Sequence, residues 1–250
     1  MTTLGKLVCG VSNHSGDAKD VLDQLSTSID RFAVKATNFL HDDFSEDAQS
    51  FGAFCARVVL ENSCAGLVGR LDPFRLLYLR AFQAQATYEY GKPAKSAFRW
   101  SGDVFTSDKP NTDMWSCDHD TSKISRALFS QYSAELHWGP AFTLALDAIT
   151  ASDTPSDIFE TLTNVEANEF VGKIKGQCAT TYSTLSKGVH WEFFVSSVMM
   201  DEDTLKDTIR NTLVVMSDLA FVSHFIPAAY HSLPPAEAID TYISFRRTLQ

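Results

Sequence analysis

Apolar residues recur at intervals of three and four positions along most of this chain, which is the spacing of one helix face. The first such stretch begins at Asp17, and the second follows an acidic run at 42–47. The apolar stripe of the first consists of Val21, Leu25, Ile29, Phe32, Ala36 and Phe39, and one face of the second carries Phe51, Phe54, Cys55, Val58, Asn62, Ala65 and Gly69. Residues 1–16 contain Gly, Ser and Asn and show no such period, so we expect a tail followed by two long helices.

A boundary falls at Leu71-Asp72-Pro73, because Asp72 can cap a helix and Pro73 suits a first helical position, where no backbone N–H is needed. We expect the next helix to end at Gly91-Lys92-Pro93. Its inward face is expected to carry Phe74, Leu77, Tyr78 and Ala81. Because the connection is so short, this helix and the preceding one are expected to form an antiparallel hairpin.

The second half of the chain returns to helical spacing after an irregular segment at 92–120. The apolar stripes there cover 121–138, 141–149, 157–187, 205–219 and 235–243. Glycine costs about 1 kcal/mol in a helix interior, so Gly172 and Gly176 predict close packing against another helix. Gly188 is expected to end its helix, and the alternation after it predicts a short extended segment near 189–196, with a short helix as the alternative.

These patterns predict an all-α fold, a multi-helix bundle of about eight helices. We expect residues 1–91 to form an N-terminal helical hairpin region, residues 92–120 an irregular connecting segment, and residues 121–250 a C-terminal helical bundle. One compact domain is the alternative. The composition agrees, because 44% hydrophobic residues, with 18 Phe, can build a sizeable core, whereas disordered chains are poor in them.

The net charge of −10 is unevenly distributed. From Arg57 to Arg99 there are seven basic and three acidic side chains, so this stretch is +4 and the remainder is −14. So acidic a chain is not expected to bind nucleic acid over its whole surface, but a local basic face can bind a partner. We predict an exposed face that binds a protein, or alternatively RNA, through Arg70, Arg75, Arg80, Lys92 and Arg99. The alternative is that these cations lie on solvated helix faces or pair with acidic neighbours.

The five cysteines form no C-x-x-C pair. Their odd number is typical of a reducing compartment and predicts neither disulfides nor structural zinc. Cys55 and Cys64 occupy apolar helical positions and are expected in the core. No window approaches 18 consecutive apolar residues, and the first 16 residues hold no long apolar run. We therefore expect a cytoplasmic protein without a transmembrane helix, secretory signal or membrane partner.

The acidic run Asp42-Asp43-Phe44-Ser45-Glu46-Asp47 is similar to the aspartate-rich motif by which helical prenyl-transfer enzymes hold magnesium and diphosphate. Carboxylate oxygens are the ligands that Mg²⁺ prefers, so Asp42, Asp43 and Glu46 are the ligands under this remote alternative. The run falls between two predicted helices, however, and no second metal motif follows. An acidic first helical turn, favoured by the helix dipole, explains it equally well.

Cys117-Asp118-His119-Asp120 combines thiol, imidazole and carboxylate groups, all of which bind transition metals. There is no second cluster, and Asp120 or Thr121 is expected to cap the following helix instead. We therefore predict no metal site and no cofactor.

Two clusters place a Tyr-Ser step and then a His-Trp step at the end of a predicted helix, at 132–138 and at 182–191. A histidine in this place either hydrogen-bonds the free terminal carbonyls of the helix or acts as a general acid or base near neutral pH. Under the second interpretation the candidate catalytic residues are His190, Lys187, Tyr182 and His137.

The later cluster, with Tyr182, Leu185, Ser186, Val189 and His190 at the end of a long predicted helix, resembles stretches in HEPN-like domains. These domains are helical bundles common in prokaryotic defence and toxin–antitoxin proteins. Many are metal-independent ribonucleases that use an arginine, a polar residue and, a few positions on, a histidine. In this sequence the nearest cation before the histidine is a lysine at 187, so the resemblance implies an inactive or scaffolding relative. The cluster at 132–138 also lacks a nearby arginine, because the nearest one before its histidine lies at position 126.

The chain contains no nucleophile elbow, P-loop or dinucleotide-binding motif. We therefore predict a non-enzymatic interaction module, an accessory subunit of a prokaryotic multi-protein system of the defence or toxin–antitoxin type. Its partner is expected to be another protein or a second copy of the chain. The alternative is a HEPN-like metal-independent ribonuclease in which His190 moves the 2′-hydroxyl proton and Lys187 replaces the arginine.

Overall fold

The computed structural model describes residues 3–11, 15–89, 97–106, 114–152, 154, 156–190 and 200–250. Within these residues the fold is all-α, as the sequence predicts, and it contains no strand. The α-helices are α1 (Leu4–Cys9), α2 (Asp17–His41), α3 (Glu46–Leu71), α4 (Pro73–Gln83), α5 (Gln131–Ser133), α6 (Gly139–Thr150), α7 (Glu160–Thr163), α8 (Ala167–His190), α9 (Glu202–Ser223) and α10 (Pro235–Arg246). Short 3₁₀ or π turns are η1 (Trp100–Val104), η2 (Thr121–Lys123), η3 (Ala134–Trp138), η4 (Ser156–Phe159) and η6 (Arg247–Leu249).

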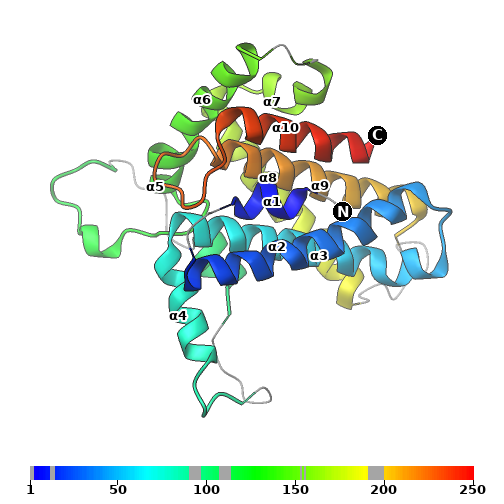
Figure 1. The fold of residues 1–250 in the computed structure, drawn as a ribbon, viewed down its shortest axis with the longest axis horizontal. Helices are drawn as coiled ribbons and strands as arrows, with labels where there is room; N and C mark the ends of the chain where they lie inside the picture. Colours follow the sequence, from blue (N-terminus) through cyan, green and yellow to red (C-terminus); the bar gives the residue numbers. More distant parts are fainter. Residues whose placement is uncertain are drawn as a thin grey trace.

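Helix α3 lies at the centre of the bundle, where it packs against α2, α8 and α9 (Figure 1). Its residues Ala56, Val59, Leu60 and Cys64 are completely buried. Among the described helices α3 alone is long and apolar enough to cross a membrane, and 67% of its most apolar window is buried within the protein. Burial on several sides explains why its composition is apolar all round.

The first residues of the chain form a buried helix, so the expected tail is wrong. Leu4, Leu7 and Val8 of α1 are all completely buried, and α1 packs against α2, α3, α9 and α10 (Figure 1). Six residues are too few to show a helical period, which is why the pattern missed this helix. Because α1 contacts both halves of the chain, the helices of 3–89 and of 114–250 share one hydrophobic core.

Helix α4 leaves the bundle at a steep angle, so the expected antiparallel hairpin is wrong (Figure 1). Asp72 alone separates it from α3, and Pro73 occupies its first turn, as predicted. A single linking residue leaves the chain no length in which to reverse direction and lay α4 back along α3.

The inward face of α4 is also the opposite of the one predicted. Leu76 and Leu79 are the buried residues of this helix. The residues expected to face the core are instead exposed, with exposed fractions of 70% for Phe74, 38% for Leu77 and 51% for Tyr78. The cause lies in the composition: α4 is apolar on two faces, and periodicity alone does not say which one meets the core.

The single helix expected at 157–187 is divided into η4, α7 and α8. Gly172 and Gly176 are exposed, and a Cβ at either would meet no atom within 4 Å, so their predicted close packing is wrong. The close approach occurs at Gly188, where a Cβ would lie 2.8 Å from the Cβ of Ala53 on α3. Gly188 therefore does not end α8, which continues to His190.

The extended segment expected near 189–196 is wrong at its first two positions, because Val189 and His190 are helical. Positions 191–196 lie outside the described residues. The cysteine predictions hold: all five thiols are free, and Cys55 and Cys64 are buried.

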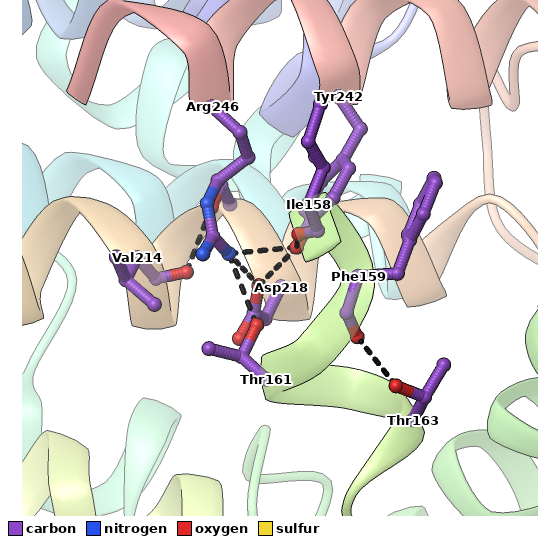
Figure 2. Close-up of polar contacts among 9 residues, drawn as sticks. Ile158, Phe159, Thr161, Thr163, Val214, Asp218, Tyr242 and Arg246 are labelled. Atoms are coloured by element: carbon purple, nitrogen blue, oxygen red, sulfur yellow. Dashed lines mark hydrogen bonds and ion pairs between the residues drawn. The ribbon is translucent and has the colours of Figure 1, made fainter. Parts of the chain in front are cut away.

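A buried ion pair joins α9 to α10 (Figure 2). Asp218 accepts hydrogen bonds from Arg246 and from the Tyr242 hydroxyl, each at 2.8 Å. Arg246 also donates to the Thr161 hydroxyl of α7 at 3.0 Å. Burial raises the pKa of the Asp218 carboxyl, and the positive charge of Arg246 opposes that rise. The network fastens the C-terminal helix to the bundle and lies away from the open surface.

Candidate functional site

Arg70, predicted on an exposed basic face, is completely buried, so that prediction is wrong for this residue. Its guanidinium donates only to neutral acceptors, namely the carbonyls of Val8 (3.3 Å) and Tyr230 (2.8 Å), the hydroxyls of Ser223 (2.5 Å) and Ser232 (3.0 Å), and Nδ1 of His224 (3.1 Å). Burial lowers the pKa of Arg70 to about 10, so it stays protonated at neutral pH. It lies where α1 and α9 end, and the negative ends of the two helix dipoles favour a cation there.

Two of the other four predicted cations are paired within the protein. Arg75 pairs with Asp103 at 3.1 Å, and Arg80 pairs with two carboxylates of α2, those of Asp17 (2.6 Å) and Asp20 (3.4 Å). Arg99 is exposed, and Lys92 lies outside the described residues. The alternative interpretation, pairing with acidic neighbours, is therefore the one that describes Arg75 and Arg80.

The acidic run at 42–47 spans the end of α2 and the start of α3. Ser45 caps α3 by accepting a hydrogen bond from the Ala48 N–H at 3.1 Å, and Glu46 and Asp47 lie in the first turn. Likewise Asp120 caps η2, as predicted. Within the described part of the chain, no three His, Cys, Asp or Glu side chains gather as metal ligands. The geometry gives no support to the magnesium alternative.

His137 is not brought together with the other candidate catalytic residues. It is half-buried in η3, which packs on α5 and α6. Burial lowers its pKa, which favours the neutral imidazole. Lys187 is exposed on α8, and its side chain makes no contact with His190 among the described residues.

The arginine missing near His190 in the sequence is supplied by another helix. Arg57 of α3 donates to the Tyr182 hydroxyl at 3.0 Å and lies 3.5 Å from Nε2 of His190. It also donates to the Ser186 hydroxyl at 3.0 Å and pairs with Glu61 at 2.9 Å. We call these five residues the Arg57 cluster.

Helix geometry explains how the cluster assembles. On α8 the three partners of Arg57 are spaced by four residues, at 182, 186 and 190, and therefore share one face. The approach of α8 to α3 beside Gly188 brings that face against the helix that carries Arg57. The spacing on α8 was visible in the sequence, but Arg57 lies more than a hundred positions away and no local motif marks it.

The Arg57 cluster opens to solvent and its aromatic member is held in place. The side chains of Arg57 and Glu61 are 16% and 42% exposed, and His190 is exposed. The Tyr182 ring lies under the Arg57 guanidinium at 4.7 Å and stacks on Trp100 with ring centroids 4.0 Å apart. A cation, two hydroxyls and an imidazole thus meet at one accessible place, a set that can bind an oxyanion and move a proton.

A second surface feature is the α4 stripe, which we define as Phe74, Leu77 and Tyr78. Its two aromatic rings lie 6.4 Å apart, and the ring of Phe82 continues the series 6.4 Å beyond Tyr78. Scattered exposed apolar residues are ordinary, but contiguous ones indicate a contact surface. Helix α4 projects from the bundle (Figure 1), and all three side chains of this stripe are exposed.

No protein-family model, curated protein or solved structure matches this chain. Its functional interpretation therefore depends on the geometry of the Arg57 cluster and of the α4 stripe.

Proposed function

We propose that this protein is an interaction module, an accessory subunit that docks on a partner protein through the α4 stripe. One observation carries the proposal: α4 has two apolar faces, and only the face with Leu76 and Leu79 is buried in the chain itself. The other face exposes Phe74 at 70% of its surface. Burying an aromatic side chain of this size contributes about 2 kcal/mol of stabilisation. The protein without a partner does not gain this stabilisation at Phe74.

The partner that fits this surface is a protein with an apolar groove. The stripe has the i, i+3, i+4 spacing by which an amphipathic helix anchors itself in such a groove. Two projecting helices of identical copies present convex surfaces to each other, which favours a groove on a different protein over self-association. The predicted role in a defence or toxin–antitoxin assembly remains a proposal that follows from the sequence resemblance.

The test is affinity capture with the full-length protein, followed by a direct affinity measurement on each partner identified. The double substitution Phe74→Ser with Tyr78→Ser should weaken the measured binding at least tenfold, because it removes two apolar anchors. The matched control is Leu136→Ser with Leu144→Ser, which changes two exposed apolar residues elsewhere on the surface. Equal binding by the stripe variant and the wild type, or a dimer in solution that the stripe variant dissociates, contradicts the proposal.

The second candidate function is a metal-independent ribonuclease at the Arg57 cluster. The observation that favours it is the contact of Arg57 with Ser186 and His190, because an arginine beside a histidine was the element missing from the sequence. In such a reaction the 2′-hydroxyl oxygen attacks phosphorus while His190 takes its proton. The P–O5′ bond then breaks, leaving a 2′,3′-cyclic phosphate and a 5′-oxygen that is protonated from solvent. Arg57 would neutralise the phosphoryl oxygens.

Cleavage of RNA in the presence of EDTA tests this candidate. His190→Ala and Arg57→Met should each lower the rate at least 100-fold, whereas Lys187→Gln should leave it nearly unchanged because Lys187 does not contact His190. Absence of cleavage by the wild-type protein eliminates the ribonuclease and leaves the docking proposal untouched.

A further inference from the structure

A cavity of about 720 Å³ lies between α2, α3, α4 and the segment 97–104, with Tyr182 of α8 at its edge. It is distinct from the α4 stripe, because its α4 wall is the inner face with Leu76 and Leu79. Ligand sites in proteins typically have volumes of about 300 to 1,000 Å³ and often lie between the helices of bundles. The size and position of this cavity are those of a small-molecule site.

The cavity is lined by both polar and apolar side chains, and its apolar part is held in place. Leu25, Leu76 and Trp100 line it from three different elements. Trp100 is fixed by its stacking on Tyr182 at 4.0 Å, and the segment that carries it is fastened to α4 by the ion pair between Arg75 and Asp103. A preformed apolar wall binds an apolar body without the cost of ordering it.

The charged side chains that line the cavity differ in whether they have an ion-pair partner. Glu61 is neutralised by Arg57 at 2.9 Å, and Arg80 is neutralised by its contacts with the carboxylates of Asp17 and Asp20. Arg99 also lines the cavity and is exposed, but its guanidinium makes no ion pair or hydrogen bond within the described residues. Its backbone N–H is tied to Asp103 at 2.7 Å, which holds the residue at the rim. Of the two arginines that line the cavity, Arg99 is therefore the one without a carboxylate partner among the described residues.

We propose that this cavity binds a small amphipathic anion, with its apolar body against Leu25, Leu76 and Trp100 and its carboxylate or other anionic group on Arg99. The apolar wall and the Arg99 guanidinium, which has no carboxylate partner among the described residues, match the two ends of such a molecule. The charge-assisted hydrogen bonds of a guanidinium suit a carboxylate. A neutral ligand would leave the cation unused, and a cation would be repelled by it. The site is independent of the docking role of α4.

The experiment is a fluorescence titration of the full-length protein with 1-anilinonaphthalene-8-sulfonate, an aromatic anion, and then its displacement by decanoate or by decanol. Arg99→Gln should weaken binding of the probe about tenfold, the effect of losing one charge-assisted contact. This variant is expected to fold normally because the Arg99 side chain is exposed and makes no hydrogen bond or ion pair with the described residues. Leu25→Trp, which fills the cavity from α2, should also weaken binding at least tenfold, and decanoate should displace the probe at lower concentration than decanol.

The matched control is Lys175→Gln, which removes a cation from the other large cavity, about 580 Å³ in volume. If this control weakens probe binding while Arg99→Gln does not, the probe occupies that cavity and the proposal is wrong. If the stripe variant Phe74→Ser with Tyr78→Ser abolishes binding, the probe lies on the surface of α4, which also overturns it. If decanoate and decanol displace the probe at the same concentration, the proposed contact between Arg99 and the anionic group is wrong.

Discussion

Two arginines on the same helix show how surroundings decide what a residue type does. Arg70, near the carboxyl end of α3, is completely buried and its partners are neutral. Arg57, thirteen positions earlier, is 16% exposed at the side chain and contacts a carboxylate, two hydroxyls and an imidazole. The first holds three parts of the chain together, whereas the second meets solvent among groups that can bind and react. The predictions below test this contrast, from the largest expected effect to the smallest.

Replacing Arg70 should be the most damaging change. Arg70→Met leaves the buried carbonyl of Val8 and the hydroxyl of Ser223 without the donor that Arg70 supplies. Each buried polar group left unsatisfied costs about 1 to 3 kcal/mol, so the total loss should be several kcal/mol. Urea denaturation followed by circular dichroism measures the free energy of unfolding. A loss below about 1 kcal/mol would show that the region around Arg70 is not the structural hub we describe.

The stability of the protein should fall as the pH drops below 6.5, because of His224. Burial lowers the pKa of His224 well below 6.5, the positive charge of Arg70 lowers it further, and the hydrogen bond to Leu7 opposes the shift. Nδ1 of this ring accepts from Arg70 and from the Leu233 N–H (3.0 Å), and Nε2 lies 2.7 Å from the Leu7 carbonyl. The neutral ring with its proton on Nε2 therefore fits the native structure. If Nδ1 were also protonated, its N–H would face two other donors, those of Arg70 and Leu233.

The sign of this effect follows from proton uptake. Between pH 6.5 and the depressed pKa of the native state, the unfolded chain binds a proton at His224 and the native chain does not. Each unit of pH lost in that window therefore removes up to about 1.4 kcal/mol of stability. Urea titrations at pH 7.5, 6.5 and 5.5 measure it, and His224→Asn should flatten the dependence. A dependence that is the same in both proteins would assign it to other groups.

Arg57 should matter much less for folding than Arg70. Its partners reach solvent, so Arg57→Met should cost about 1 kcal/mol or less, as judged by the same urea titration. If Arg57→Met unfolds like the wild type and yet loses ribonuclease activity or anion binding, Arg57 has a functional role that Arg70 does not share. A loss comparable with that of Arg70→Met would mean that the Arg57 cluster is structural.

The smallest effect is expected at the α4 stripe. Phe74→Ser with Tyr78→Ser should change the free energy of unfolding by about 0.5 kcal/mol or less, because neither side chain packs against the core. Thermal denaturation of the two proteins, measured side by side, is sufficient. A fall of several degrees in Tm would place these residues in the core and remove the basis of the docking proposal.

Part of the fold could be predicted from the sequence, because helical periodicity is a local signal. The long helices α2, α3, α8 and α9 lie where apolar residues recur at helical spacing, and Asp120 caps η2 as predicted. The six-residue helix α1 was missed because it is shorter than the window in which a period can be recognised. The sequence identified only part of the candidate site. Tyr182 and His190 lie in one local stretch and could be predicted together, whereas Arg57 lies on another helix and could not.

The sequence alone sets the helical class and the face of α8 that carries Tyr182, Ser186 and His190, because both depend on residues close together in the chain. Only the packing of the helices decided which apolar face of α4 is buried, that Arg70 is enclosed, and that Arg99 has no carboxylate partner among the described residues. The reason is physical. Burial and ion pairing depend on which helices meet, and residues far apart in the chain, such as Arg57 and His190, come together only when the bundle packs.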